Sequence, residues 1–279
     1  MRLEALRTMN YEVAEAIAPT WERRRGFIEE ISTPVRRWMI DALAPRPGDT
    51  VLELAAGVGD TGFEAAGMLG AEGRLISSDI SPAMLEAARR RGAELGVEHV
   101  DYRVIDAERI PVATDSVDGV LCRFGYMLMA DPAAALAETR RVLRPGGRLA
   151  LAVWGAPERN PFFAVVGKAL VERGHVPPPE PQQPGIFSLA DERRTRALLE
   201  HAGFAEVRAS EVPVSAVFAD VGEYLDIVAD TAGPIAMALR GIPEDERKAI
   251  RTMLEQPFSP FARAGGYELP GAALVAAAS

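Results

Sequence analysis

The chain has 279 residues, a formal net charge of −9 and a hydrophobic content of 48%. This length fits one large domain or two small ones, and this hydrophobic content suffices for a sizeable core. The acidic balance argues against nucleic acid as the main partner, because binding phosphates requires clustered lysine and arginine side chains. The single cysteine, Cys122, excludes a disulfide within the chain and a cysteine-based zinc site, and the three histidines stand far apart, so we expect no metal.

The chain shows no targeting or membrane signal. Its first residues, Met1-Arg2-Leu3-Glu4, lack the apolar core of a signal peptide. No apolar run approaches the length of a membrane span. We therefore expect a cytoplasmic protein without a membrane span, which acts as a monomer or a homodimer.

The N-terminal part is predicted to be helical. Pro34 is expected to begin a helix that Ser32 and Thr33 can cap, and apolar residues then repeat at helical spacing. The preceding segment, residues 11–31, carries Trp21 next to a run of charged residues. This segment could be a solvated helix face or a cap that closes over a ligand, and the sequence leaves both interpretations open.

The stretch Glu53–Gly62 is predicted to form a nucleotide-type binding corner. Residues 50–54 are mostly apolar, follow a Pro-Gly-Asp turn and are expected to form a short buried strand. Gly57 and Gly59 tolerate positive φ and carry no side chain, so a ligand can approach the backbone closely. A helix is expected to begin directly after Gly59, and its first turn offers free amide groups.

Two ligands fit this corner. The spacing Gly57-x-Gly59-x-x-Gly62 matches the dinucleotide fingerprint, in which the end of the helix faces a pyrophosphate. Glu53, at the tip of the strand, favours S-adenosylmethionine (SAM), because a carboxylate repels a pyrophosphate but attracts an ammonium and a sulfonium group. A tight turn that binds no ligand is the third interpretation.

Two further carboxylates are expected at the ends of the next strands. Asp79 follows the second strand, at about the distance from the glycine loop at which a carboxylate binds ribose hydroxyl groups. Because Ser81 and Pro82 already supply the cap and first position of the next helix, Asp79 remains available for a ligand. Asp106 follows the third strand. Ligands of open parallel sheets bind outside the carboxyl ends of the strands, so Glu53, Asp79 and Asp106 are predicted to share one edge.

Strands and helices continue to alternate along the rest of the chain. The fourth strand is expected over residues 117–124 and the fifth over residues 148–154, with a helix between them that Asp131 caps. This alternation predicts a parallel sheet with helices on both faces. Residues 207–217 are expected to form the sixth strand and residues 271–278 the seventh.

The segment between the last two strands, at about residues 220–262, is expected to be helical and to have no role in the cofactor corner. It could form a lid over the acceptor, or its large side chains could be ordinary packing residues between helices. The candidates for lining such a lid are Tyr224, Met237, Phe258 and Phe261.

Four segments, in the expected order, resemble the class I SAM-dependent methyltransferases. Val51–Gly59 is similar to the first motif of that class, and Asp79–Leu85 to its ribose-binding segment. Asp106–Pro111 is similar to the adenine-binding segment, and Leu143–Leu149 to the turn before the fifth strand. The combination of these motifs is more specific than any one of them alone.

Within this class the chain most resembles the ubiquinone/menaquinone biosynthesis C-methyltransferases, the methyltransferase type 11 group. Phe124 and Asp131 match the segment that follows the fourth strand in these enzymes. The chain departs from the pattern at Arg123, where a serine is usual, and at residues 126–129, which replace leucine, arginine and asparagine. Ala55 replaces the first glycine that is common in the class. These departures leave the acceptor open.

The resemblance implies one class I methyltransferase domain over residues 1–279. It implies an α/β, Rossmann-like, doubly wound sheet of seven strands in the order 3-2-1-4-5-7-6, with the last strand antiparallel. Residues 1–46 would form an N-terminal helical cap, residues 47–155 the SAM-binding core, and residues 156–279 a C-terminal part that contains the helical lid.

The expected function is transfer of a methyl group from SAM to carbon or oxygen of a small-molecule acceptor by in-line displacement, which yields S-adenosylhomocysteine. The alternatives are an NAD(P)-dependent oxidoreductase that uses the same glycine loop and a SAM-binding protein without turnover. The residues expected to bind the cofactor are Glu53, Ala55, Gly57, Val58, Gly59, Asp79, Ile80, Met84, Asp106, Ala107, Arg123 and Phe124.

The sequence offers no convincing catalytic base. His175, on a proline-rich loop, and Tyr126, after the fourth strand, are weak candidates, because a base must reach the proton that it removes. Arg123 could bind an anionic acceptor, or it could contact the cofactor.

Overall fold

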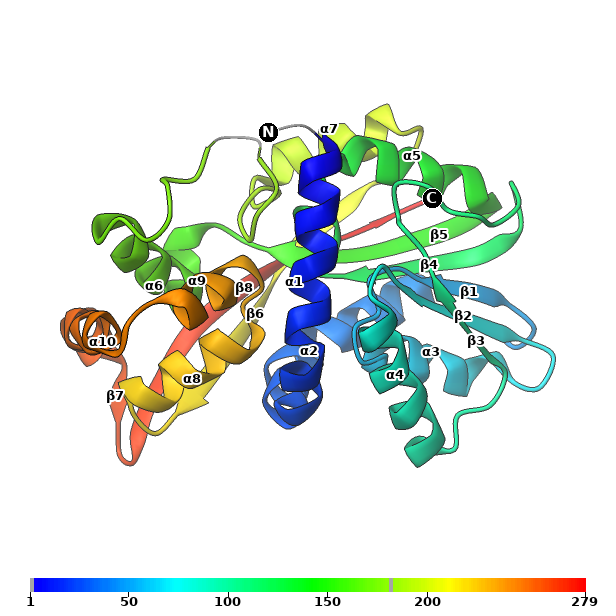
Figure 1. Cartoon of the computed structure of the whole chain (residues 1–279). Coiled ribbons are helices and arrows are strands. Elements are labelled where there is room, and N and C mark those ends of the chain that lie inside the picture. Colours follow the sequence, from blue (N-terminus) through cyan, green and yellow to red (C-terminus); the bar gives the residue numbers. More distant parts are fainter. Residues whose placement is uncertain (1–2, 181–182) are drawn as a thin grey trace.

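The computed structural model describes residues 3–180 and 183–279. Within these residues one mixed sheet forms the centre of the molecule, and helices cover both of its faces (Figure 1). The strand order is β3-β2-β1-β4-β5-β8-β6, and a short strand, β7, pairs with β8. The strands are β1 (Thr50–Glu53), β2 (Arg74–Asp79), β3 (Val100–Val104), β4 (Val117–Arg123), β5 (Leu143–Trp154), β6 (Arg208–Phe218), β7 (Ala262–Arg263) and β8 (Gly266–Ala278).

The strand order confirms the predicted arrangement. Strands β1 to β5 pair in parallel, and β8 lies antiparallel between β5 and β6. The last strand begins earlier than expected, at Gly266, because it pairs with β6 as far as the register Phe218↔Tyr267. The β7 pairing, Ala262↔Tyr267 and Arg263↔Gly266, was not expected.

The helices that connect and cover the strands include one long N-terminal pair. Short 3₁₀ turns occur at η1 (Tyr126–Leu128), η2 (Pro157–Arg159) and η3 (Ser259–Phe261). The helices are α1 (Leu3–Arg23), α2 (Arg25–Leu43), α3 (Asp60–Leu69), α4 (Pro82–Leu95), α5 (Pro132–Val142), α6 (Pro161–Glu172), α7 (Glu192–His201), α8 (Val221–Thr231), α9 (Pro234–Gly241) and α10 (Glu244–Phe258).

Side-chain caps start several of these helices where the sequence predicted them. The Ser81 hydroxyl accepts a hydrogen bond from the Met84 amide at the start of α4. The Asp131 carboxylate accepts one from the Ala134 amide at the start of α5. Each cap satisfies an amide that has no partner within its own helix, so these two boundaries are fixed by local chemistry.

The predicted helix start at Pro34 is wrong. Helix α2 runs without a break through this proline. The Ser32 and Thr33 hydroxyls donate to the carbonyls of Ile28 and Glu29, one turn back, and cap nothing. Proline lacks the amide that would bond one turn back. The buried face of α2, which packs on β4, β5, β6 and β8, keeps the helix continuous in spite of that loss.

Helix α1 (dark blue in Figure 1) crosses in front of the sheet, where it contacts α2, α4, α8 and α9. It is amphipathic and buries little apolar surface of its own. Among the described helices, none combines the length and the apolar character that crossing a membrane requires. Because α1 lies over the sheet, it forms the roof of the candidate site.

Candidate active site

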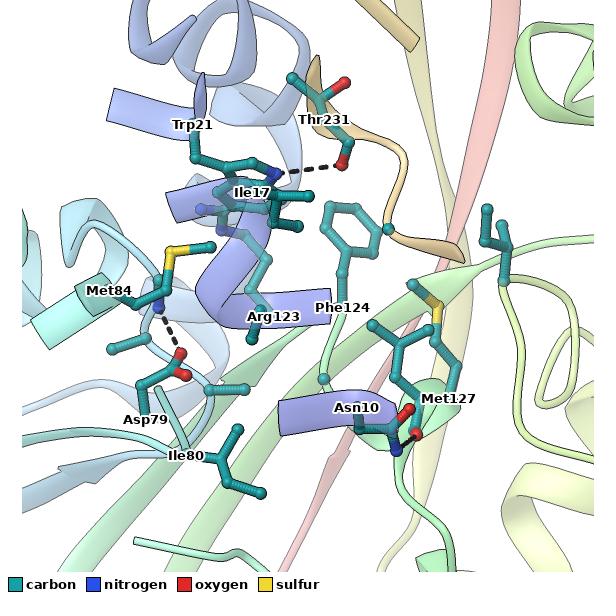
Figure 2. Close-up of a pocket in the computed structure, with 18 of the residues that line it drawn as sticks. Asn10, Ile17, Trp21, Asp79, Ile80, Met84, Arg123, Phe124, Met127 and Thr231 are labelled. Atoms are coloured by element: carbon teal, nitrogen blue, oxygen red, sulfur yellow. Dashed lines mark hydrogen bonds between the residues drawn. The ribbon is translucent and has the colours of Figure 1, made fainter. Parts of the chain in front are cut away.

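A cavity of about 230 Å³ opens at the carboxyl edge of the sheet. Its floor consists of the segments that follow β1, β2, β3 and β4. Helices α1 and α2 and the connection between α8 and α9 close it from above (Figure 2). In a doubly wound sheet this edge is where ligands bind. The predicted helical cap thus lies over the predicted cofactor corner.

The loop between β1 and α3 brings bare backbone to the cavity. Gly57 and Gly59 have φ of 56° and 90°, and Ala55 takes a φ of 50° although it carries a side chain. A Cβ at Gly57 would lie 3.3 Å from Cζ3 of Trp21, which comes from α1. Ala55 and Gly57 line the cavity, whereas Gly59 and the buried Val58 do not, so only part of the predicted loop faces a ligand.

Glu53 lies behind the glycine loop and does not line the cavity, contrary to the prediction. It is 2% exposed, and its Oε1 accepts a hydrogen bond of 2.8 Å from the Gly62 amide. A Cβ at position 62 would lie 2.2 Å from Oε2 of Glu53, so this glycine makes room for the carboxyl group. Burial raises the pKa of Glu53 to about 8. Glu53 therefore supports the turn into α3, and the predicted row of three carboxylates facing a ligand is reduced to two.

Asp79 stands at the end of β2 and lines the cavity. Its Oδ2 accepts a hydrogen bond from the Gly57 amide, and its Oδ1 accepts one from the Ser81 amide, both at 2.9 Å. Burial raises the pKa of Asp79, and these backbone donors oppose that rise. Ile80 and Met84 lie beside the carboxylate and offer apolar surface (Figure 2).

Asp106 and Ala107, which follow β3, also line the cavity, and there α1 is fastened over them. Nε and Nη2 of Arg7 donate to Oε2 of Glu108 at 2.9 and 2.6 Å. Nε of Arg7 is also 3.9 Å from Oδ2 of Asp106. The other Glu108 oxygen accepts from the Asp131 amide at 3.0 Å. Sequence reasoning missed Arg7 and Glu108, because nothing local to either residue indicates the other.

Further polar contacts hold α1 along its length. The Asn10 side chain donates to the Leu128 carbonyl, and the Trp21 indole donates to the Thr231 carbonyl at 3.0 Å (Figure 2). Glu15 accepts a hydrogen bond from the Ser81 hydroxyl. These contacts join α1 to the segments after β2 and β4 and to the end of α8. Of the two interpretations that the sequence left open for residues 11–31, the cap is the one that fits this arrangement.

The other half of the cavity is aromatic. The Phe124 and Trp154 rings stack with centroids 4.3 Å apart at an angle of 8°, and Phe163 lies 4.9 Å from Trp154. Phe27 of α2 stacks on Phe162 at 5.9 Å. All five side chains line the cavity. These rings make this part of the cavity wall apolar and aromatic.

The predicted lid segment reaches the cavity, but not through the predicted side chains. The connection between α8 and α9, Thr231–Pro234, forms part of the wall. Tyr224 is fully buried and its hydroxyl donates to the Phe162 carbonyl, and Phe258 is fully buried beside it. Tyr224 and Phe258 are therefore packing residues between helices. Met237, which is 40% exposed, and Phe261 do not line the cavity either.

Arg123, at the end of β4, points into the cavity between Phe124 and Met84 and toward Trp21 (Figure 2). Its Nε donates to the Thr61 hydroxyl at 2.8 Å. Its Cζ lies 5.8 Å from the centre of the Phe124 ring. The guanidinium group thus lies between the first turn of α3 and the aromatic compartment.

Both weak catalytic candidates lie outside the cavity. Tyr126 is fully buried, its hydroxyl is 2.6 Å from the Thr139 hydroxyl, and burial raises its pKa well above the ordinary value. Nε2 of His175 lies 3.0 Å from Oε2 of Glu246, to which Arg173 also donates. Among the described residues, the cavity wall contains no histidine, tyrosine, lysine or cysteine. The geometry therefore gives no support to either candidate as a base.

Comparison with known proteins gives one family and one fold. The ubiE/COQ5 methyltransferase family matches residues 30–164. Over 184 residues the chain is 32% identical to the ubiquinone/menaquinone biosynthesis C-methyltransferase UbiE of Haemophilus ducreyi, a match that covers 62% of this chain and 70% of that protein. It is 28% identical over 185 residues to the protein of the same name from Teredinibacter turnerae, covering 62% and 74%. The chain spans about half the length of several other such relatives.

Among solved structures, the YcgJ protein of Bacillus subtilis superposes with a TM-score of 0.61 at 22% identity. The superposition covers 88% of this chain and 97% of that one. At this level of identity the likeness concerns the fold, which is the Rossmann-like fold of the sheet described above. The family match spans the glycine loop, Asp79, Asp106 and Arg123, whereas α1 and the part of the chain after residue 164 lie outside it.

Proposed function

The chain belongs to the ubiE/COQ5 methyltransferase family, and on that premise we propose that it methylates a carbon atom of a small, flat, mainly apolar acceptor. Membership makes it a SAM-dependent methyltransferase. The nicotinamide-dependent oxidoreductase and the SAM-binding protein without turnover are accordingly not favoured.

The residues of the cavity fit an S-adenosyl group at one end. Asp79 offers a carboxylate that already meets two amides and still has lone pairs for hydroxyl groups. Ile80 and Met84 offer flat apolar contact for a base, and the backbone at Gly57 can be approached closely. We assign the ribose to Asp79 and the adenine to the surface between Met84 and Asp106.

The single observation that carries the acceptor proposal is the aromatic compartment at the other end. Phe124 and Trp154 stack there and Phe163 packs on Trp154 at a tilt, whereas Asp79, which is assigned to the cofactor, lies at the other end. A planar ring gains burial and stacking in such a place, while a sugar or a peptide would leave its polar groups without partners. The names of the relatives, which refer to quinone biosynthesis, point to acceptors of the same kind.

The described wall contains no histidine, tyrosine, lysine or cysteine, and its carboxylates, Asp79, Asp106 and Glu108, are assigned to the cofactor end or bonded to Arg7, which favours carbon as the attacked atom. When bound, SAM supplies a methyl group on a positively charged sulfur that a nucleophile can attack in line. An electron-rich ring carbon beside a hydroxyl group is nucleophilic before it loses a proton, so it needs alignment more than it needs a base. In this proposal the aromatic faces orient the ring, and α1 with the turn Thr231–Pro234 excludes water.

A product analysis tests this proposal. The purified protein would be incubated with SAM labelled with ¹³C in the methyl group and with matched acceptors: hydroquinones, naphthohydroquinones, their O-blocked ethers, and aliphatic alcohols and amines. We expect ¹³C–carbon bonds, identified by NMR and mass spectrometry, only in products of the flat rings with a free hydroxyl group. Labelled oxygen or nitrogen atoms as the main products, or turnover of the aliphatic compounds alone, would contradict the proposal.

A further inference from the structure

We infer that Arg123 forms a carboxylate-binding subsite inside the cavity. This inference rests on the cavity being the cofactor and acceptor site of a SAM-dependent methyltransferase, and not on the flat apolar acceptor proposed above. Three observations lead to the inference: the guanidinium has few partners, its neighbours are engaged elsewhere, and it is aimed at the ligand space.

The first observation is the lack of a counter-ion. Among residues 3–180 and 183–279, no carboxylate oxygen lies within 4.0 Å of a nitrogen of Arg123, and the one hydrogen bond of its side chain is that from Nε to Thr61. The two terminal nitrogens, with their fork of N–H donors, have no hydrogen-bond partner in the same residues. A partly buried charge without a counter-ion is costly unless a ligand supplies an opposite charge and hydrogen-bond acceptors.

The second observation concerns the nearest acidic groups. Asp60 and Glu53 act on Arg123 only at longer range. Asp60 is 3.5 Å from Arg91, and Glu53 accepts from the Gly62 amide. By contrast Arg7, the other arginine of the cavity wall, is paired at 2.6 Å with Glu108. Within the described part of the chain, the wall therefore holds one arginine with a carboxylate partner and one without.

The third observation is direction. Arg123 rises from the end of β4 past Phe124 toward Trp21, and its side chain lines the cavity (Figure 2). Its anchor, Thr61, is in the first turn of α3, directly after the glycine loop. A carboxylate in this part of the cavity would meet two parallel N–H groups of the guanidinium, the geometry that makes such pairs strong and specific.

Two sources could supply this carboxylate. If the adenosine lies by Asp79 and Asp106, the amino-acid end of the cofactor extends past Gly57 toward α3, which brings its α-carboxylate toward Arg123. The alternative source is a carboxylate on the acceptor, reaching Arg123 from the aromatic compartment. The position of Thr61 favours the cofactor, and the experiment below has one arm for each source.

The first arm measures binding by calorimetry, without turnover. Decarboxylated SAM retains the adenosine, the sulfonium and the amine but lacks the carboxylate. We expect the wild-type protein to bind SAM at least about tenfold more tightly than decarboxylated SAM. Arg123→Met and Arg123→Ser should lose this preference. Arg7→Met, which removes the paired arginine of the same cavity, should keep the ratio even where both affinities fall.

The second arm uses the protein saturated with S-adenosylhomocysteine and compares 4-hydroxybenzoate with phenol. If the acceptor is the source, the wild-type protein should bind the carboxylate compound about tenfold more tightly, and Arg123→Met should lose that difference. Thermal unfolding verifies that each variant is folded. Arg123→Lys replaces the neutral variants if those do not fold. Because the wild-type comparisons need no variant, a wild-type protein without preference in both arms overturns the inference. Preferences that survive intact in folded Arg123→Met or Arg123→Ser overturn it as well.

Discussion

At the level of single residues, Asp79 joins the two parts of the cofactor corner. One carboxylate oxygen accepts a hydrogen bond from the Gly57 amide and the other accepts one from the Ser81 amide. The glycine loop and the start of α4 therefore meet at this carboxylate. That Asp79 binds the ribose remains a prediction from the sequence. The geometry adds to this prediction which atoms of the carboxylate are already bonded. A ligand hydroxyl would add a charge-assisted hydrogen bond to a carboxylate that is already positioned.

We expect Asp79→Ala to weaken SAM binding about tenfold or more. Removing hydrogen bonds to a charged group costs roughly 1.5–3 kcal/mol, and about 1.4 kcal/mol corresponds to a tenfold change in Kd. Calorimetric titration with SAM measures this change. Asp226→Ala is the matched control, because Asp226 pairs with Arg247 on the surface and lies outside the cavity wall. Equal affinity in a folded Asp79→Ala protein would refute the ribose assignment.

Glu53 is expected to make the folded state less stable as the pH rises. Burial raises the pKa of this carboxyl from 4.5 to about 8 in the folded chain. Between these values the folded chain holds a proton that the unfolded chain has released, so the free energy of unfolding falls with increasing pH. Glu53→Gln keeps an oxygen that can accept from the Gly62 amide but does not titrate in this range.

Urea unfolding of both proteins at about pH 5 and about pH 8 tests this expectation. The stability of Glu53→Gln relative to wild type should rise from the lower to the higher pH, because only the wild-type side chain then has to ionise in a buried place. Other groups titrate equally in both proteins, so the difference isolates Glu53. A difference that is constant or falls with pH would show that the carboxyl is ionised throughout.

The residues that sequence reasoning misplaced share a physical cause. Glu53 belongs to the expected cofactor corner and Tyr126 follows the fourth strand, but neither side chain lines the cavity. Glu53 is held by the first turn of α3, and Tyr126 by Thr139 of α5. The direction of a side chain at the end of a strand depends on the partner it finds, and such partners are not visible in the local pattern.

At the level of elements, the strands and caps that the sequence predicted are those with local signals. Glycine turns, alternating apolar residues and the caps at Ser81 and Asp131 depend on neighbours in the sequence, and the structure confirms them. The attachment of α1 depends on contacts between residues that are distant in the sequence, such as Arg7 with Glu108. The sequence alone therefore could not decide between a solvated helix and a cap for this segment.

We expect Arg7→Met to loosen α1. The pair it breaks joins a mostly buried glutamate to a less buried arginine, and hydrogen bonds to charged groups are worth roughly 1.5–3 kcal/mol before discounting for solvent. Amide hydrogen exchange in the first half of α1 should therefore become about tenfold faster, while exchange in the central strands stays unchanged. Arg159→Met is the control, because its ion pair with Glu211 is long, at 3.7 Å, and exposed.

An unchanged exchange rate in α1 of Arg7→Met would mean that other contacts fasten this helix. The candidates are then the Asn10 and Trp21 hydrogen bonds to the Leu128 and Thr231 carbonyls. Acceleration throughout the chain would mean instead that α1 unfolds only together with the sheet. Local opening, which leaves the strands protected, is the outcome that agrees with a cap.

At the level of the whole molecule, the apolar contacts divide into one large core and one small cluster. The large core begins at Val35 and includes buried residues of β1, β4, β5 and β8. The small cluster contains Ile17 and Ala18 of α1 together with Met84 and Ala236. Helix α1 thus packs on the rest of the protein mainly by polar contacts and a minor apolar patch. The C-terminal strand β8 is instead paired on both sides, with β5 and with β6.

This division predicts opposite results for shortening the chain at its two ends. A protein that starts at Arg25 should unfold cooperatively, as judged by circular dichroism in urea, because it keeps the large core. It should bind SAM at least about tenfold more weakly, since the roof over Gly57 and Asp79 is gone and water reaches the cavity. A protein that ends at Pro270 should not fold, because it loses the strand that joins β5 to β6. Full SAM affinity in the protein that starts at Arg25 would mean that α1 does not act as a cap over the cofactor.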